Sequence, residues 1–118
     1  MKSFYVVTFV LCVLYFISTA FAAEFRLSNP QQCVGWGKTA AMIQLTKQKG
    51  MDMNDVLKEY LAETKREPRE KMEVEAVVHL IKHIYSDGDS TVHYMDIYKS
   101  YYEGCIRNQG LVYSNKDI

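Results

Sequence analysis

Two cysteines, Cys33 and Cys105, place the strongest constraint on how this chain of 118 residues can fold. They lie near opposite ends of the region that follows an apolar N-terminal segment, and the third cysteine, Cys12, lies inside that segment. In an oxidising compartment two such cysteines form a disulfide, which requires their α-carbons to lie within about 7 Å. The fold must then bring residues 33 and 105 together. The alternative is a pair of free, buried thiols.

The N-terminal segment has the features of a secretory signal peptide. Lys2 gives it a positive start, residues 4–17 are uncharged and almost wholly apolar, and Ala20 and Ala22 are the small residues that signal peptidase requires. We therefore expect a signal peptide over residues 1–22 and an exported protein, periplasmic or extracellular, with no membrane association after cleavage. The alternative is an uncleaved anchor, because residues 4–23 are just long enough to span a bilayer.

The rest of the chain, residues 23–118, is long enough for one domain and too short for two. The whole chain has 14 basic and 14 acidic residues, and Lys2 is the only charged residue before Glu24. Residues 23–118 therefore carry 13 basic and 14 acidic residues. A balance near zero argues against a partner such as duplex nucleic acid, whose binding depends on neutralising many phosphates. We expect no cofactor, and the sequence does not predict the oligomeric state or the organism.

The apolar spacing predicts an all-α fold of about four helices, at residues 30–49, 54–65, 69–85 and 90–108. Asn29 and Pro30 are typical of a helix start, and Gly50 of a helix end. Either Asp89 or Ser90 is expected to cap the last helix. Residues 24–28 are expected to be extended, and the tail from residue 111 to residue 118 has no assigned structure.

Helix number and cysteine position support each other. Four helices that run alternately up and down, with short loops between them, bring the start of the first and the end of the fourth to the same end of the bundle. Cys33 and Cys105 occupy those two places. The sequence therefore predicts a small helical bundle closed by a Cys33–Cys105 disulfide.

The last helix carries an unusually aromatic face. Four of the nine tyrosines of the chain fall between Tyr94 and Tyr102. We expect most of them to pack in the core with their hydroxyls at its rim. The apolar arc is wider than two neighbouring helices can cover, however, so part of it is a candidate surface for a protein partner. The candidate residues are Met95, Tyr102 and Ile106, bordered by Trp36 and Gln44 of the first helix.

One polar pattern could hold a metal ion. Glu75, His79 and His83 are spaced four residues apart on the third predicted helix, and two imidazoles at this spacing can share one transition metal. The three residues project away from the apolar side of that helix, where no second shell of groups would orient them. We therefore expect this triad to form an ordinary polar face and not a metal site.

The sequence contains none of the motifs that carry nucleophilic catalysis or phosphate binding. Its carboxylates are numerous, but nothing marks two of them as an acid and base pair. We therefore expect a non-enzymatic exported protein that recognises an unidentified protein through its aromatic helix face, as an inhibitor or immunity protein does. The alternative hypothesis is a periplasmic carrier of a small ligand or a metal.

Overall fold

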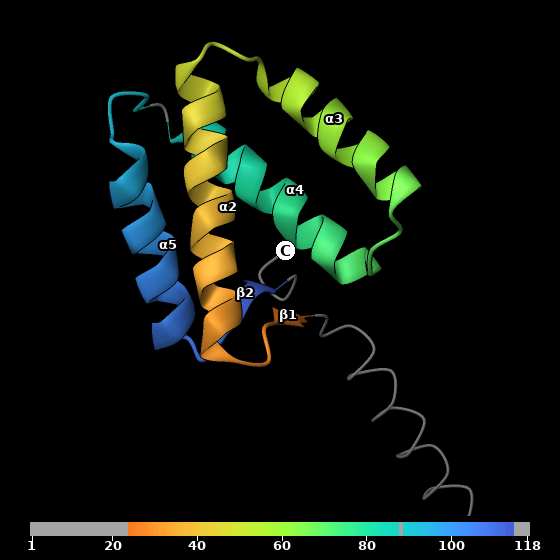
Figure 1. Ribbon diagram of the computed structural model, residues 1–118, viewed down its shortest axis with the longest axis vertical. Helices are drawn as coiled ribbons and strands as arrows, with labels where there is room; N and C mark the ends of the chain where they lie inside the picture. The colour runs from red at the N-terminus through yellow and green to blue at the C-terminus, as the bar shows by residue number, and fades with distance from the viewer. Residues whose placement is uncertain (1–23, 88, 115–118) are drawn as a thin grey trace, which may run out of the picture.

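A computed structural model describes residues 24–87 and 89–114, and Figure 1 shows that they form a mostly helical domain. The predicted signal peptide, residues 1–22, lies outside the described residues. The described residues form four helices, as predicted: α2 (Pro30–Gln48), α3 (Met53–Arg66), α4 (Lys71–Ser86) and α5 (Tyr94–Arg107). Two short strands, β1 (Glu24–Arg26) and β2 (Leu111–Ser114), complete the described fold.

The first helix begins and ends as its sequence indicates. The Asn29 side chain accepts a hydrogen bond from the backbone N–H of Gln32, at 3.1 Å, and Pro30 takes the first helical position, where no N–H is needed. At the other end Gly50 has φ of 90°. Its N–H donates to the Lys47 carbonyl, and the next N–H donates to the Thr46 carbonyl. These two bonds form a Schellman motif, which glycine favours because it has no Cβ.

The start of the last helix differs from the prediction. Helix α5 begins at Tyr94, and its N-cap is His93, whose Nδ1 accepts a hydrogen bond from the Met95 N–H at 3.1 Å. Asp89 lies four residues before this cap, and its Oδ1 accepts hydrogen bonds from the backbone N–H and the hydroxyl of Thr91. The predicted caps, Asp89 and Ser90, instead belong to the turn that precedes the helix. Asx turns of this kind compete with capping for the same side chains.

The helices run alternately up and down, and α2 lies at the centre of the packing (Figure 1). Helix α5 runs antiparallel beside it and makes the most extensive contact of any pair of elements, while α4 packs on α2 from the other side. Helix α3 packs on α4. The core is built by α2, α4 and α5, and its buried members are Cys33, Trp36, Ala40, Ile43, Ala76, Leu80, Ile81, Ile84 and Cys105.

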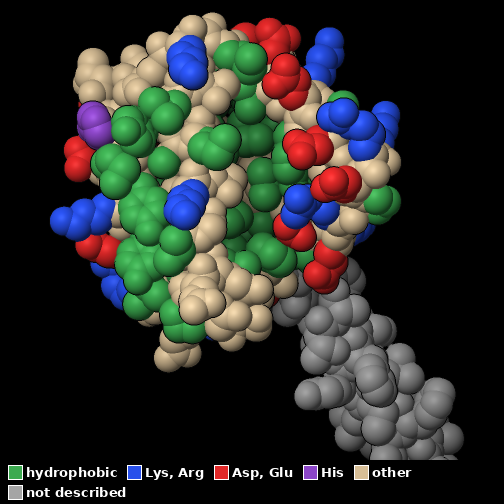
Figure 2. Space-filling model, in the orientation of Figure 1, with side chains coloured by type: hydrophobic (Ala, Val, Ile, Leu, Met, Phe, Trp, Pro, Cys, Tyr) green, Lys and Arg blue, Asp and Glu red, His purple; other side chains and the backbone are tan. Residues whose placement is uncertain are grey.

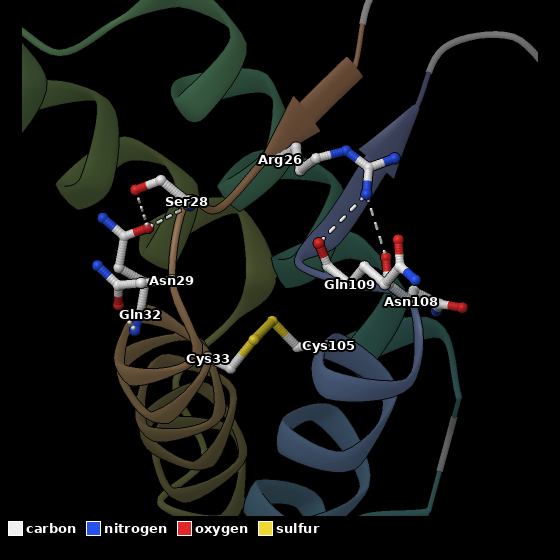
Figure 3. Close-up of a disulfide and its surroundings, with 8 residues drawn as sticks. All are labelled: Arg26, Ser28, Asn29, Gln32, Cys33, Cys105, Asn108 and Gln109. Atoms are coloured by element: carbon white, nitrogen blue, oxygen red, sulfur yellow. Dashed lines mark hydrogen bonds between the residues drawn. A yellow bond between two sulfur atoms is a disulfide. The ribbon is translucent and has the colours of Figure 1, made fainter.

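The predicted disulfide is present. Cys33 and Cys105 are separated by 72 residues in sequence, and their α-carbons lie 5.6 Å apart. Figure 3 shows that the bond joins the first turn of α2 to the last turn of α5. Both cysteines are buried in the core, so the bond fixes these two helices at the end of the domain where the described chain begins and ends.

A small antiparallel sheet was not part of the all-α prediction. Strand β1 pairs with β2, Phe25 lies opposite Tyr113, and the register shifts between Phe25 and Arg26. Both strands contact α4, and Phe25 and Tyr113 pack against the core. Residues 24–28 were expected to be extended, but a strand of three residues has no recognisable pattern without its partner. Only the closed bundle, which brings the two ends together, makes the pairing possible.

Hydrogen bonds join the start of the chain to the end of α5 (Figure 3). Arg26 Nη1 donates to the carbonyls of Gln109, at 3.2 Å, and Asn108, at 3.4 Å. The Leu27 N–H donates to the Gly110 carbonyl at 2.8 Å. Gly110 has φ of 87°, and a Cβ there would collide with the Leu27 carbonyl oxygen. A glycine is therefore required where the two ends of the domain cross.

Candidate functional site

The apolar surface with the clearest link to the aromatic pattern runs along α5. Met95, Tyr98, Tyr102 and Ile106 follow one another at intervals of three or four residues, which places them in one row on the helix. We call this row the α5 stripe. It is about 16 Å long at the usual rise per residue. Met95 is 51% exposed and Ile106 is 41% exposed, so the two ends of the stripe are open to solvent.

The centre of the stripe is held rigidly. The rings of Tyr98 and Tyr102 stack at 5.8 Å between centroids and are nearly parallel, with 4° between their planes. Tyr98 lies against Gly37 of α2, so closely that a Cβ on this glycine would be 2.9 Å from the Tyr98 ring. Tyr102 packs on the edge of the core. Both rings are therefore held by packing, Tyr98 against α2 and Tyr102 against the core, although each keeps part of its surface exposed.

Apolar side chains gather over α5 and along its border with α2 (Figure 2). Scattered apolar residues on a protein surface need no explanation, whereas a continuous row is typical of an interaction site. Tyrosine is well suited to such a site because it presents a large rigid area and loses little conformational entropy on binding. The α5 stripe thus has the composition and the rigidity of an interface centre.

The two residues of the first helix that were expected to border this surface are buried. Trp36 is 9% exposed and Gln44 is 1% exposed. Gln44 Nε2 donates to the carbonyls of Val92, at 2.9 Å, and Asp89, at 3.3 Å. Gln48 reaches the same segment and donates to the Val92 and Ser90 carbonyls. The amide of Gln44 therefore holds the α4–α5 connection in place, and this explains why a polar residue lies in the buried arc of α2.

Trp36 lines a cleft between α2, α4 and α5. The cleft has a volume of about 340 Å³ and is open to solvent on one side. Ile97 and Tyr101 contribute to its apolar lining, and His83 and Asp87 contribute polar groups. Burial, with a smaller contribution from Asp87, raises the pKa of Tyr101 to about 12. This cleft could hold a small molecule that has both an apolar body and a polar end.

The cleft combines residues whose proximity was not anticipated from the sequence. Neither Asp87 nor Tyr101 was among the candidate site residues. The available signal was the up-and-down topology, which brings the end of the third predicted helix next to the fourth. Without the crossing angles of the helices, that topology does not say which side chains meet.

The histidines of the metal candidate lie on exposed parts of α4 and make ring contacts. The His79 ring is 5.3 Å from the Tyr113 ring, the His83 ring is 6.3 Å from the Tyr101 ring, and the two imidazoles are 6.3 Å apart. Within residues 24–87 and 89–114, no three His, Cys, Asp or Glu side chains are placed to hold one metal ion. The set of Glu75, His79 and His83 is thus not assembled into a metal site in this structure.

None of the described helices is long and apolar enough to cross a membrane. Comparisons of the chain with models of protein families, with curated proteins and with solved structures found no match.

Proposed function

We propose that this chain is an exported, non-enzymatic protein that recognises another protein through the α5 stripe. The observation that carries the proposal is the stripe itself. Two exposed apolar ends, Met95 and Ile106, flank a stacked tyrosine pair on a helix that is joined covalently to the core. A surface that is apolar, aromatic and already ordered loses little entropy when it binds a partner.

Export is part of the proposal and rests on two observations. Residues 1–22 have the features of a secretory signal peptide, and the Cys33–Cys105 disulfide is consistent with an oxidising compartment. The near balance of charge on the remaining chain favours a protein partner over nucleic acid.

The test is affinity capture with the oxidised protein as bait, compared among three forms. The first is the wild type. The second carries Met95→Glu and Ile106→Glu, which place carboxylates at the exposed ends of the stripe. The third is a matched control, Leu61→Glu, because Leu61 is 42% exposed on α3 and lies away from α5. Circular dichroism and a thiol assay first establish that all three are folded and oxidised.

We expect the wild type and the Leu61→Glu control to capture the same protein, and the stripe variant to lose it. Hot-spot residues typically contribute about 2 kcal/mol or more each, so two substitutions should weaken binding by about 1,000-fold. Capture that is equal for all three forms would show that the stripe is not the interface. Failure of every form to capture a partner would count against a protein-binding function.

The cleft at Trp36 supports a second candidate function, a carrier of a small ligand. Trp36 is the only tryptophan of the chain, so no other tryptophan contributes to its emission. Native mass spectrometry of the protein isolated from the cells that make it would reveal a bound small molecule as an added mass. An added mass that Tyr101→Ala removes would support the carrier function. An unmodified mass, together with the same Trp36 emission in the wild type and in Tyr101→Ala, would argue against it.

A further inference from the structure

A second apolar surface lies on the other side of α2, between this helix and the α3–α4 hairpin. Figure 2 shows it as a hollow whose floor is apolar. Its volume is about 360 Å³, and it is open to solvent. The apolar lining is formed by Met42, Ile43, Val56, Tyr60, Val77 and Ile81. We call this hollow the α2–α3 groove.

The groove exists because α3 is only partly covered by the rest of the domain. Helix α3 has no fully buried residue, although its hydrophobic side chains are segregated on one face. It packs on α4 and leaves the side that faces α2 open. On the opposite wall Met42 is 67% exposed, the highest value among the large apolar side chains described. A methionine in such a position can adapt its shape to an incoming surface.

The border of the groove is acidic. Glu59, Glu63 and Glu73 line it, and Arg69 is its only basic residue, which leaves a net charge of −2. Arg69 is paired with Glu73 at 2.9 Å. Glu59 and Glu63 belong to neither of the ion pairs found among the described residues. They lie one helical turn apart on α3, so two unpaired negative charges border one edge of the apolar floor.

Tyr60 adds a polar group with no partner. Its hydroxyl is buried and makes no hydrogen bond within the described part of the chain. Burial, with a further contribution from Glu73, raises the pKa of this hydroxyl. A buried hydroxyl without a partner destabilises the fold, because it has lost its hydrogen bonds to water. A small rotation of the ring towards a bound polar group would remove this cost, because Tyr60 already lines the groove.

We propose that the α2–α3 groove binds a short amphipathic helix of another protein, with apolar residues on the face that enters the groove and Lys or Arg beside them. The two walls, residues 39–46 of α2 and residues 56–63 of α3, each span about 10 Å. This length fits two turns of helix, which present apolar side chains at positions i, i+4 and i+7. The basic residues pair with Glu59 and Glu63. This surface is separate from the α5 stripe and does not depend on the function proposed for it.

The test uses a 14-residue Leu/Lys amphipathic peptide as the probe, and the same peptide with every Lys replaced by Glu as its comparator. Each is titrated into the oxidised, 15N-labelled protein, and the amide chemical shifts are followed by NMR. We expect the basic peptide to bind with a Kd of about 10–100 μM, as suits a small interface. The shifts should be confined to residues 39–46, 56–63 and 73–81.

Three variants locate the site. Met42→Glu places a charge on an exposed side chain in the groove and should abolish binding of the basic peptide. Glu59→Lys with Glu63→Lys should weaken the basic peptide by about tenfold or more and strengthen the acidic one. Met95→Glu, on the exposed end of the α5 stripe, is the matched control and should change neither titration.

Equal binding of the two peptides would overturn the requirement for basic residues, and shifts on α5 would overturn the location. Binding that survives Met42→Glu would also overturn the proposal. A loss of peptide binding in Met42→Glu alone leaves the α5 function intact, whereas a loss of partner capture in the α5 variants alone leaves the groove intact. The two proposals can therefore fail independently.

Discussion

Replacement of Gly37 by alanine tests whether the close approach of α2 and α5 positions the tyrosine stripe. A Cβ at residue 37 would lie 2.9 Å from the Tyr98 ring and 3.0 Å from the Tyr98 backbone oxygen. The ring could turn aside, but the backbone oxygen can retreat only if α5 moves as a whole. The Cys33–Cys105 bond, one helical turn from Gly37, opposes that movement. We therefore expect Gly37→Ala to destabilise the protein.

Two effects of opposite sign set the magnitude. Alanine is favoured over glycine in a helix interior by about 0.8–1 kcal/mol. Overpacking of a close-packed interface typically costs about 1–3 kcal/mol. The net expectation is a loss of about 1 kcal/mol in the free energy of unfolding. Gly35 supplies the matched control, because it lies in the same helix and a Cβ there would meet nothing within 4 Å. Gly35→Ala should therefore stabilise the protein by the helix-propensity term alone.

Urea unfolding of the oxidised proteins, followed by far-ultraviolet circular dichroism, measures both effects. The difference between the two variants should be about 2 kcal/mol, which at a slope of about 1–2 kcal/mol/M separates their midpoints by about 1–2 M. Equal stability of Gly37→Ala and Gly35→Ala would refute the reasoning, because it would mean that α5 yields to a methyl group at no cost.

Three further perturbations have defined outcomes. Reduction of Cys33–Cys105 should cost about 4 kcal/mol for a closed loop of this length and lower Tm by about 15–30 °C in a calorimetric scan; a shift of a few degrees would contradict it. Gly110→Ala should cost about 2–4 kcal/mol in urea unfolding, because the added Cβ collides with the Leu27 carbonyl; a loss below about 1 kcal/mol would show that the crossing is not tight. The raised pKa of Tyr101, about 12, stabilises the fold below its unfolded pKa of about 10, and this contribution is lost as the pH rises from 10 to 12. After allowance for partial exposure it amounts to about 1–2 kcal/mol, and Tyr101→Phe should remove that slope from stability measured against pH.

The helices could be predicted because their start and end signals are local in sequence. The disulfide could be predicted because few cysteines are present. Asn29, Pro30 and Gly50 act through hydrogen bonds within one turn of the backbone, so their effect does not depend on the rest of the fold. The disulfide followed from a single possible pairing after Cys12 was set aside, and the number of helices placed the two sulfurs at one end. These inferences needed no knowledge of side-chain packing.

The features that escaped prediction depend on contacts between distant segments. The cap of α5 is an exception, because its alternatives are local: Asp89 accepts from Thr91, and His93 accepts from Met95. Helix propensity alone does not decide which of these acceptors becomes the cap. The β1–β2 pairing requires the bundle to be closed before the strands can meet. Gln44 was expected to border an exposed surface, and its burial could not be predicted because its partners are backbone carbonyls about 45 residues away in sequence. For the strands and for Gln44, the sequence contains the group and the fold supplies its partner.

Helix α2 is tied closely to α5 but not to α3, so the α5 side of the domain is rigid and the α3 side can adjust. Its small residues admit Tyr98 of α5 and its first turn carries the disulfide. Lys47 donates to the Ile84 carbonyl, and Gln44 and Gln48 donate to the Val92 carbonyl. No comparable bond ties α3 to α2 among the described residues, and α3 has no fully buried side chain. Elements with few buried contacts open at low free energy. The α5 stripe is therefore suited to recognition by a preformed surface, whereas the α2–α3 groove has one fixed wall and one that can move to fit what it binds.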